Sequence, residues 1–225
     1  MANKIKYGIE KVYYAVATIA ADGSATYDTP VALPGAVNLS LEAQGDQNVF
    51  YADNINYYVS QANNGYQGDL EMALLTDDFR KAILGEHEST TGKVLVEEAD
   101  VAPAHFALLF QFEGDIKATR FVMYNCVASR PATASTTKAE SIEPQTETVQ
   151  ITATSIYNAA LDSDIVRAKT GEETTQTVYD DGSQRSGSRL TKEGVKHEKR
   201  HHDRGQVNRA GGFCRHAFYL PEGLP

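Results

Sequence analysis

The sequence predicts a mainly β protein, an antiparallel β-sandwich or barrel with one short flanking helix and long loops. Three observations lead to this expectation. Several segments alternate apolar and polar residues with a period of two, which is typical of strands with one buried and one wetted face. Turn sequences containing glycine lie between these segments. One further segment carries the start and stop signals of a helix.

The alternation is clearest in residues 148–154, where Val149, Ile151 and Ala153 are separated by threonine and glutamine. In residues 69–74 the same period places Leu70, Met72 and Leu74 on one predicted buried face. Similar alternation occurs in 37–42 and 106–113, and segments rich in β-branched and aromatic residues occupy 9–19, 55–60, 93–97 and 116–128. These segments are the predicted strands.

Short turn sequences punctuate the predicted strands. Asp22-Gly23 is a hairpin signal after the first strand. Glu113-Gly114-Asp115 separates two strong strand candidates, so we expect a hairpin there. Pro34-Gly35 and Asn63-Asn64-Gly65 mark two further turns.

A short helix is expected at about 76–84. Thr76 is a suitable N-cap, because its side-chain oxygen can accept a hydrogen bond from a free amide of the first turn. Asp77 and Asp78 follow, where negative charge favours the helix dipole. Phe79 and Ile83 lie four residues apart on one face, which should close an end or side of the sheet. Gly85 can adopt the left-handed conformation that ends a helix.

Length and composition exclude several classes of protein. The chain has 225 residues, a net charge of −9, 41% hydrophobic residues and 23% charged residues, which excludes collagen, a fully disordered chain and a multispan membrane protein. No apolar run approaches about 18 residues, so we expect no membrane insertion. No signal peptide is visible. Two cysteines, Cys126 and Cys214, are too few for a disulfide scaffold, so synthesis in a reducing cytoplasm is expected.

The charge is unevenly distributed along the chain. Residues 1–182 carry 12 Lys+Arg and 26 Asp+Glu, or −14, whereas residues 183–225 carry 9 and 4, or +5. We therefore predict a β domain over 1–182, with exposed loops at about 44–66 and 131–146. We expect residues 183–225 to form a basic, disordered C-terminal segment, because they show neither strand nor helix periodicity.

Residues that could carry chemistry do not assemble into a recognisable site. A cluster of His197, His201, His202 and Asp203 is surrounded by lysine and arginine, which repel a metal cation. Thr91-Gly92-Lys93-Val94 lacks the glycine spacing and the hydroxyl of a phosphate-binding loop. Cys126 lies within a predicted strand, and neither it nor His87 or His105 belongs to a nucleophile–base set. We therefore predict no enzymatic activity, no catalytic residue, no cofactor and no metal. The acidic body also argues against direct nucleic-acid binding.

A set of segments, in this order and spacing, resembles one protein family. The segments are VALPGAVNLSL (31–41), FYADN (50–54), NNGY (63–66), DDFR (77–80), ALLFQFEG (107–114) and FVMYNC (121–126). Together they resemble the major tail protein, or tail tube protein, of long non-contractile-tailed bacteriophages and prophages. The resemblance covers about residues 1–180.

The resemblance implies a structural virion protein with a tail-tube type of β-sandwich or barrel. Its subunits would assemble into hexameric rings that stack into a hollow tail tube, located in the virion tail. The tube would house the tape-measure protein and conduct double-stranded DNA without binding it specifically. It also implies tail-assembly chaperones as partners, in addition to the ring and stacked-ring contacts of the chain with itself, and no enzymatic activity and no cofactor.

A tyrosine-rich, mostly uncharged region provides the candidate inter-subunit contacts. Such loops suit protein–protein interfaces, and the predicted contact residues are Phe50, Tyr51, Tyr57, Tyr58 and Tyr66. The alternative is that these rings cover the sheet of their own subunit. The acidic body further predicts a tube interior of net negative charge, which would repel DNA phosphates and let DNA slide.

The resemblance stops after Gly182. One hypothesis is that residues 183–225 are read in a shifted frame, because composition and charge change abruptly there. Two other functions remain as alternatives for the whole chain. It could be a monomeric β-sandwich binding or adhesion module of a phage tail or cell surface, or a metal-dependent enzyme that uses the histidine-rich C-terminal segment.

Overall fold

The computed structural model describes residues 3–137, 144–159, 161–172 and 174. The protein is mainly β with antiparallel sheets and one short helical segment, as the sequence predicts. The main sheet has the strand order β2-β1-β10-β11-β12-β7-β4, with β3 paired to β1 and β15 paired to β11. Its long strands are β1 (Lys6–Ile19), β4 (Ala36–Gln44), β7 (Gly65–Met72), β10 (Phe106–Gly114), β11 (Thr119–Ala128) and β12 (Glu147–Thr154).

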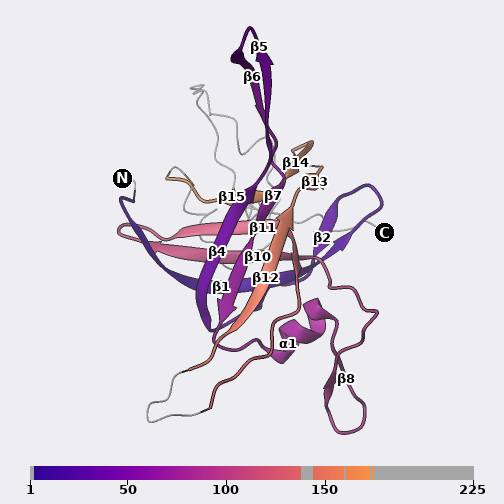
Figure 1. Ribbon diagram of the computed structural model, residues 1–225. Helices are drawn as coiled ribbons and strands as arrows, with labels where there is room; N and C mark the ends of the chain where they lie inside the picture. Colours follow the sequence, from indigo (N-terminus) through magenta and orange to yellow (C-terminus); the bar gives the residue numbers. More distant parts are fainter. Residues whose placement is uncertain (1–2, 138–143, 160, 173, 175–225) are drawn as a thin grey trace, which may run out of the picture.

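The sheet folds over on itself at β11. The first half of this strand, Phe121–Met123, pairs with β15 (Arg167–Lys169), whereas the second half, Asn125–Ala128, pairs with β12. As a result, β4, β7 and β12 cross over β1, β10 and β11 as a second layer (Figure 1). The main hydrophobic core joins the two layers and includes Tyr14, Leu70, Met72, Phe106, Leu108, Val149 and Ile151.

The short helix lies at one end of this sandwich. Thr76 is its N-cap, and the Thr76 side-chain oxygen accepts a hydrogen bond from the Phe79 amide at 3.3 Å. Only α1 (Asp77–Phe79) is α-helical, and η1 (Arg80–Leu84) continues it as a π-helix that ends at Gly85 with φ of 77°. Phe79 and Ile83 are fully buried in the core, so the predicted apolar stripe does close an end of the sandwich.

Two details of the strand prediction are wrong. Leu74 is not on a buried strand face, because β7 ends at Met72 and the chain leaves the sheet at Ala73, whose amide donates to the Gly35 carbonyl. Beyond that point the pleat no longer sets the direction of side chains, and Leu74 is exposed. The predicted strand 93–97 shrinks to β9 (Leu95–Val96), which pairs only with β8 (His87–Glu88) in a small hairpin.

Short strands that the sequence did not predict complete the fold. Besides β8, they are β2 (Ala25–Tyr27), β3 (Val31–Ala32), β13 (Ile156–Asn158), β14 (Ser163–Ile165) and β15. With two or three residues each, they are too short to show a period-two pattern. Residues of β2, β13, β14 and β15 pack on the outer face of β11 around the buried side chain of Tyr124. The predicted hairpins at Asp22-Gly23 and Glu113–Asp115 are confirmed.

The two predicted exposed loops differ in structure. Residues 44–66 include a second sheet of two strands, β5 (Gln47–Ala52) and β6 (Ile55–Gln61). Residues 131–137 and 144–146 have no regular structure and are mostly exposed. The predicted C-terminal segment 183–225, with its histidine cluster, lies outside the described residues, as do residues 175–182.

Candidate functional site

The β5–β6 hairpin projects from one end of the body, away from the core (Figure 1). It carries six large apolar side chains that are between 47% and 69% exposed. They are Phe50 (61%), Tyr51 (64%), Ile55 (61%), Tyr57 (69%), Tyr58 (63%) and Val59 (47%). Burial of such side chains is favourable by roughly 25 cal/mol per Å². Leaving all six in water is therefore a strong sign of a surface that becomes covered.

Local sequence explains why this segment forms a hairpin. Ala52 pairs with Ile55, so Asp53 and Asn54 form a two-residue turn. Both have positive φ, 51° and 60°, as the favoured type I′ hairpin turn requires. Aspartate and asparagine tolerate this left-handed conformation better than other non-glycine residues. At the base of the hairpin, Gly65 has φ of 97°, and a Cβ there would lie 2.0 Å from the Ala153 carbonyl oxygen.

Apolar side chains occupy both faces of the hairpin. Val49 pairs with Val59, and the next pair along the strands is Phe50 with Tyr58. Successive side chains of a strand point to opposite faces, so neither face is purely polar. A two-stranded sheet on its own is at best marginally stable in water. The arrangement thus fits a hairpin that is stabilised by contact with other molecules.

The structure separates Tyr66 from the other four predicted contact residues. Phe50, Tyr51, Tyr57 and Tyr58 lie together on the hairpin, whereas Tyr66 is on β7 and packs against the main core. The Arg167 guanidinium lies 4.9 Å from the Tyr66 ring centroid, a cation–π geometry. A role of these residues in inter-subunit contact stays a prediction.

Sequence reasoning missed Ile55 and Val59, which belong to the same exposed surface. The available signal was the Asp53-Asn54 dipeptide, because both residues tolerate the left-handed conformation and lie between two segments rich in apolar residues. Recognising it would have placed residues 47–61 in one hairpin without a buried face.

A second surface of interest is the outer face of β4, β7 and β12. The core-facing residues of these strands include Leu39, Leu70 and Ile151, so the alternate residues point outward. Strand register places them in rows across the three strands. The rows are Asn38–Glu71–Thr148, Ser40–Asp69–Gln150 and Glu42–Gln67–Thr152. Three of these side chains are carboxylates and none is a cation, so the face is polar and negatively charged.

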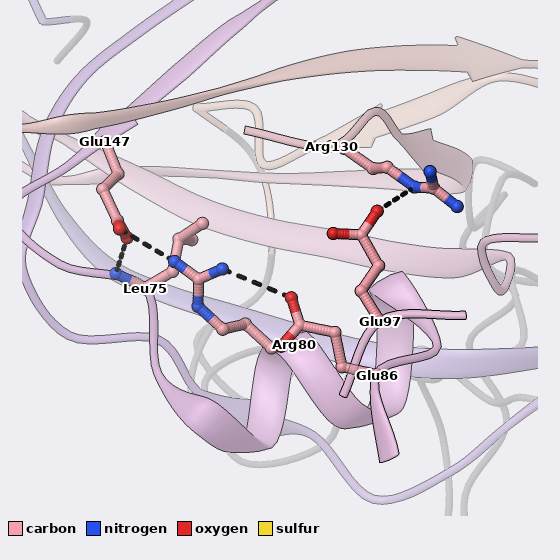
Figure 2. A network of polar contacts seen from close by, with 6 residues as sticks. All are labelled: Leu75, Arg80, Glu86, Glu97, Arg130 and Glu147. Carbon is pink, nitrogen blue, oxygen red and sulfur yellow. Dashed lines mark hydrogen bonds and ion pairs between the residues drawn. The ribbon is translucent and has the colours of Figure 1, made fainter. Parts of the chain in front are cut away.

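A polar network surrounds the helical segment, which lies at the end of the body opposite the hairpin (Figure 1). Figure 2 shows this network from close by. The Arg80 guanidinium lies 2.8 Å from the Glu147 carboxylate and 3.3 Å from that of Glu86. The other Glu147 oxygen accepts a hydrogen bond from the Leu75 amide at 2.8 Å. These side chains are largely shielded from solvent. Because Leu75 precedes α1 and Glu86 follows η1, the network ties β12 to both ends of the helical segment.

A more exposed ion pair lies nearby. The Arg130 guanidinium is 2.8 Å from the Glu97 carboxylate, and both side chains are about half exposed (Figure 2). It connects the end of β11 to the segment that follows β9. Exposed pairs of this kind contribute little to stability, so the Arg80–Glu147 contact is the stronger of the two.

The residues considered for chemistry have structural surroundings. Cys126 is fully buried in the core, and burial raises the pKa of its thiol to about 12, so it is no nucleophile at neutral pH. His87 lies 3.3 Å from exposed Glu98, and the His105 ring nitrogen contacts the Asn125 side-chain oxygen at 2.7 Å. Gly92 and Lys93 form the β8–β9 turn.

Neither a metal cluster nor a membrane helix was found in the described part of the chain. Among those residues, no group of three or more histidine, cysteine, aspartate or glutamate side chains is arranged to hold a metal ion. None of the helices described there has the length and apolarity needed to cross a bilayer.

Comparison with known proteins found no family model that matches this chain and no curated protein similar to it.

Proposed function

We propose that this chain is the structural subunit of a phage tail tube. Its copies assemble into rings, six to a ring by the family resemblance, and the rings stack into a tube. The tube houses the tape-measure protein and conducts double-stranded DNA, and the subunit has no enzymatic activity.

The observation that carries the proposal is the exposed β5–β6 hairpin. Its four aromatic rings are 61–69% exposed, and a buried aromatic side chain covers about 150–250 Å². These four rings therefore present about 500 Å² to solvent. The largest apolar patch of an ordinary monomer is about 300–600 Å², and a stable interface buries about 800 Å² per partner. With Ile55 and Val59 added, the exposed apolar area of the hairpin exceeds the apolar patch of an ordinary monomer and comes close to the area of a stable interface. Contact with other copies is therefore its expected state.

The acidic face of β4, β7 and β12 supports the same function. A tube that conducts DNA needs an inner wall to which phosphates do not adhere. The rows that contain Glu42, Asp69 and Glu71 present carboxylates among neutral hydroxyl and amide groups, with no cation. Such a surface repels DNA and carries no apolar patch that would hold the tape-measure protein. We therefore assign this face to the inner wall of the tube.

Electron microscopy of the purified full chain tests the proposal. We expect rings or tubes from the natural sequence. A hairpin variant, Phe50→Ser/Tyr57→Ser/Tyr58→Ser, should remain folded by circular dichroism and lose assembly. Substitutions at exposed side chains usually change the free energy of unfolding by only about 0.5 kcal/mol.

A matched control separates the hairpin from surface hydrophobicity in general. The control variant Ile5→Ser/Tyr7→Ser/Ile116→Ser removes three side chains that are 52–60% exposed elsewhere, and it should still assemble. Dispersed monomers of the natural chain at all concentrations would instead favour the alternative, a monomeric binding module. Loss of assembly in both variants would show that the hairpin has no special role.

A further inference from the structure

We infer that residues 175–181, which follow the last described residue, dock on an apolar surface of their own chain. This surface, here called the N-terminal patch, is formed by Ile5 (60% exposed), Tyr7 (52%) and Ile116 (53%). It lies where the start of β1 meets the turn between β10 and β11, away from the β5–β6 hairpin (Figure 1). The inference does not depend on the proposed function, because it concerns a single copy of the chain.

Hydrogen bonds join the two segments that form the N-terminal patch. The Asn3 side-chain oxygen accepts from the amides of Ile116 at 3.2 Å and Lys117 at 2.9 Å, and the Asn3 side-chain nitrogen donates to the Lys117 carbonyl. The Lys4 amide donates to the Asp115 carboxylate at 2.9 Å. The patch is therefore a fixed surface, which loses less conformational entropy when it is covered than a mobile one.

The described chain ends close to this patch. Beyond β15, the Thr170 amide donates to the Arg120 carbonyl at 3.0 Å, and the Thr170 hydroxyl oxygen accepts from the Arg120 amide at 3.0 Å. A turn follows, in which the Gly171 amide donates to the Thr174 hydroxyl oxygen at 2.8 Å. Arg120 is four residues from Ile116, which is about 13 Å along an extended chain. Four residues after Thr174 span about the same distance, so the residues that follow them reach the patch.

The composition of the segment complements that of the patch. Val178 and Tyr179 are the large apolar residues of 171–182, and this stretch has four carboxylates and neither lysine nor arginine. Lysines at positions 4, 6 and 117 flank the patch, against carboxylates at 113 and 115. Opposite charges within a Debye length of about 8–10 Å attract one another. Because residues 1–182 sum to −14, the lysine-flanked patch attracts an acidic segment where the acidic body as a whole repels it.

The short connection favours docking within one chain over docking on a second copy. A short tether gives an effective concentration in the millimolar range, which is far above the concentration of a second copy in dilute solution. Docking of this kind covers the N-terminal patch and leaves the hairpin, rather than the patch, for contact between copies.

Thiol labelling of the full chain tests the inference. The background is the hairpin variant with Cys214→Ser added, so that contact between copies does not protect a thiol. Cys126 stays because it is buried. Ile116→Cys places the probe thiol in the patch. Val94→Cys is the matched control, because this residue is 59% exposed in the β8–β9 hairpin.

Docking predicts that the patch thiol is protected until the segment is changed. Adding Val178→Ser/Tyr179→Ser should raise the labelling rate of Ile116→Cys about tenfold, the factor that about 1.4 kcal/mol of docking gives. The rate at Val94→Cys should not change. Equal rates at Ile116→Cys with and without the segment change would refute the inference. A rise at both probes would also refute it, since loosening of the whole fold would then be the cause.

Oxidation of the pair Ile116→Cys/Tyr179→Cys identifies the chain that supplies the segment. A disulfide needs Cα atoms about 4.4–6.8 Å apart, so docking within one chain should give a monomer that has lost two hydrogens by mass spectrometry. The control pair Val94→Cys/Tyr179→Cys should remain reduced. Disulfide-linked dimers in place of the internal disulfide would put the segment on a second copy and overturn the inference. Both readouts are made on a single copy, so a failure to form rings or tubes would refute the proposed function and leave this inference standing.

Discussion

Glu147 holds two separate groups beside the helical segment, Arg80 and the Leu75 amide, which makes it a sensitive site for perturbation. One carboxylate oxygen lies 2.8 Å from the Arg80 guanidinium, and the other accepts from the Leu75 amide at 2.8 Å. The Glu147 side chain is 26% exposed, so water replaces only part of what a truncation removes. Glu147→Ala therefore leaves a guanidinium and a backbone amide poorly paired.

The expected magnitude follows from these two contacts. A hydrogen bond to a charged group contributes about 1.5–3 kcal/mol. Allowing for partial access of water, Glu147→Ala should lower the free energy of unfolding by about 2–3 kcal/mol. With a urea dependence of about 2 kcal/mol per molar, the unfolding midpoint should fall by about 1–1.5 M.

The assay is urea unfolding followed by far-UV circular dichroism, since the chain has no tryptophan. It is run in the hairpin variant, so that assembly does not add to the measured stability. Glu97→Ala is the matched control, because its pair with Arg130 is about half exposed on both sides. This control should lose less than about 1 kcal/mol.

A double-mutant cycle completes the experiment. Arg80→Met and Glu147→Ala should together cost less than the sum of the single changes, with a coupling of about 1 kcal/mol or more. Equal midpoints for Glu147→Ala and Glu97→Ala, or additive effects in the cycle, would refute the idea that shielding from water makes the Arg80 network the stronger one.

Two further outcomes are expected from the core. Phe79→Ala should destabilise the protein by about 3–5 kcal/mol in the same assay. The reason is that this fully buried ring contacts Tyr14 and Phe106 edge-on, at centroid distances of 5.1 and 5.9 Å. A loss below about 1 kcal/mol would contradict its role in closing the sandwich. In the Cys214→Ser variant, Cys126 should resist a thiol reagent at pH 8 and react fully in denaturant, since burial raises its pKa to about 12; rapid labelling of the native protein would show that this part of the core opens.

Much of the fold was predictable because it depends on residues that are close together in the sequence. The alternation in 148–154 became β12 with Val149, Ile151 and Ala153 buried. The Thr76 cap and the Gly85 stop bracket the helical segment as expected. In each case neighbouring residues carry the information, either through the two-residue period of a strand or through the chemistry of a cap.

The site was only partly predictable. The sequence indicated a tyrosine-rich contact region, yet it grouped Tyr66 with Tyr57 and Tyr58. The structure puts Tyr66 against the core and the other two on the projecting hairpin. The composition of a segment shows that its aromatic rings favour burial. It does not show whether the surface that covers a ring belongs to the same chain.

By itself, the sequence determined most of the long strands, the helix cap, the acidic character of the body and the presence of an aromatic segment. The tertiary structure alone decided that β11 turns the sheet back on itself, that outward residues of three strands form one acidic face, and that residues 47–61 leave the body. It also joined Arg80 to Glu147, 67 residues apart. The physical reason is that these features depend on pairing between distant segments, whose free energy comes from contacts that no local pattern encodes.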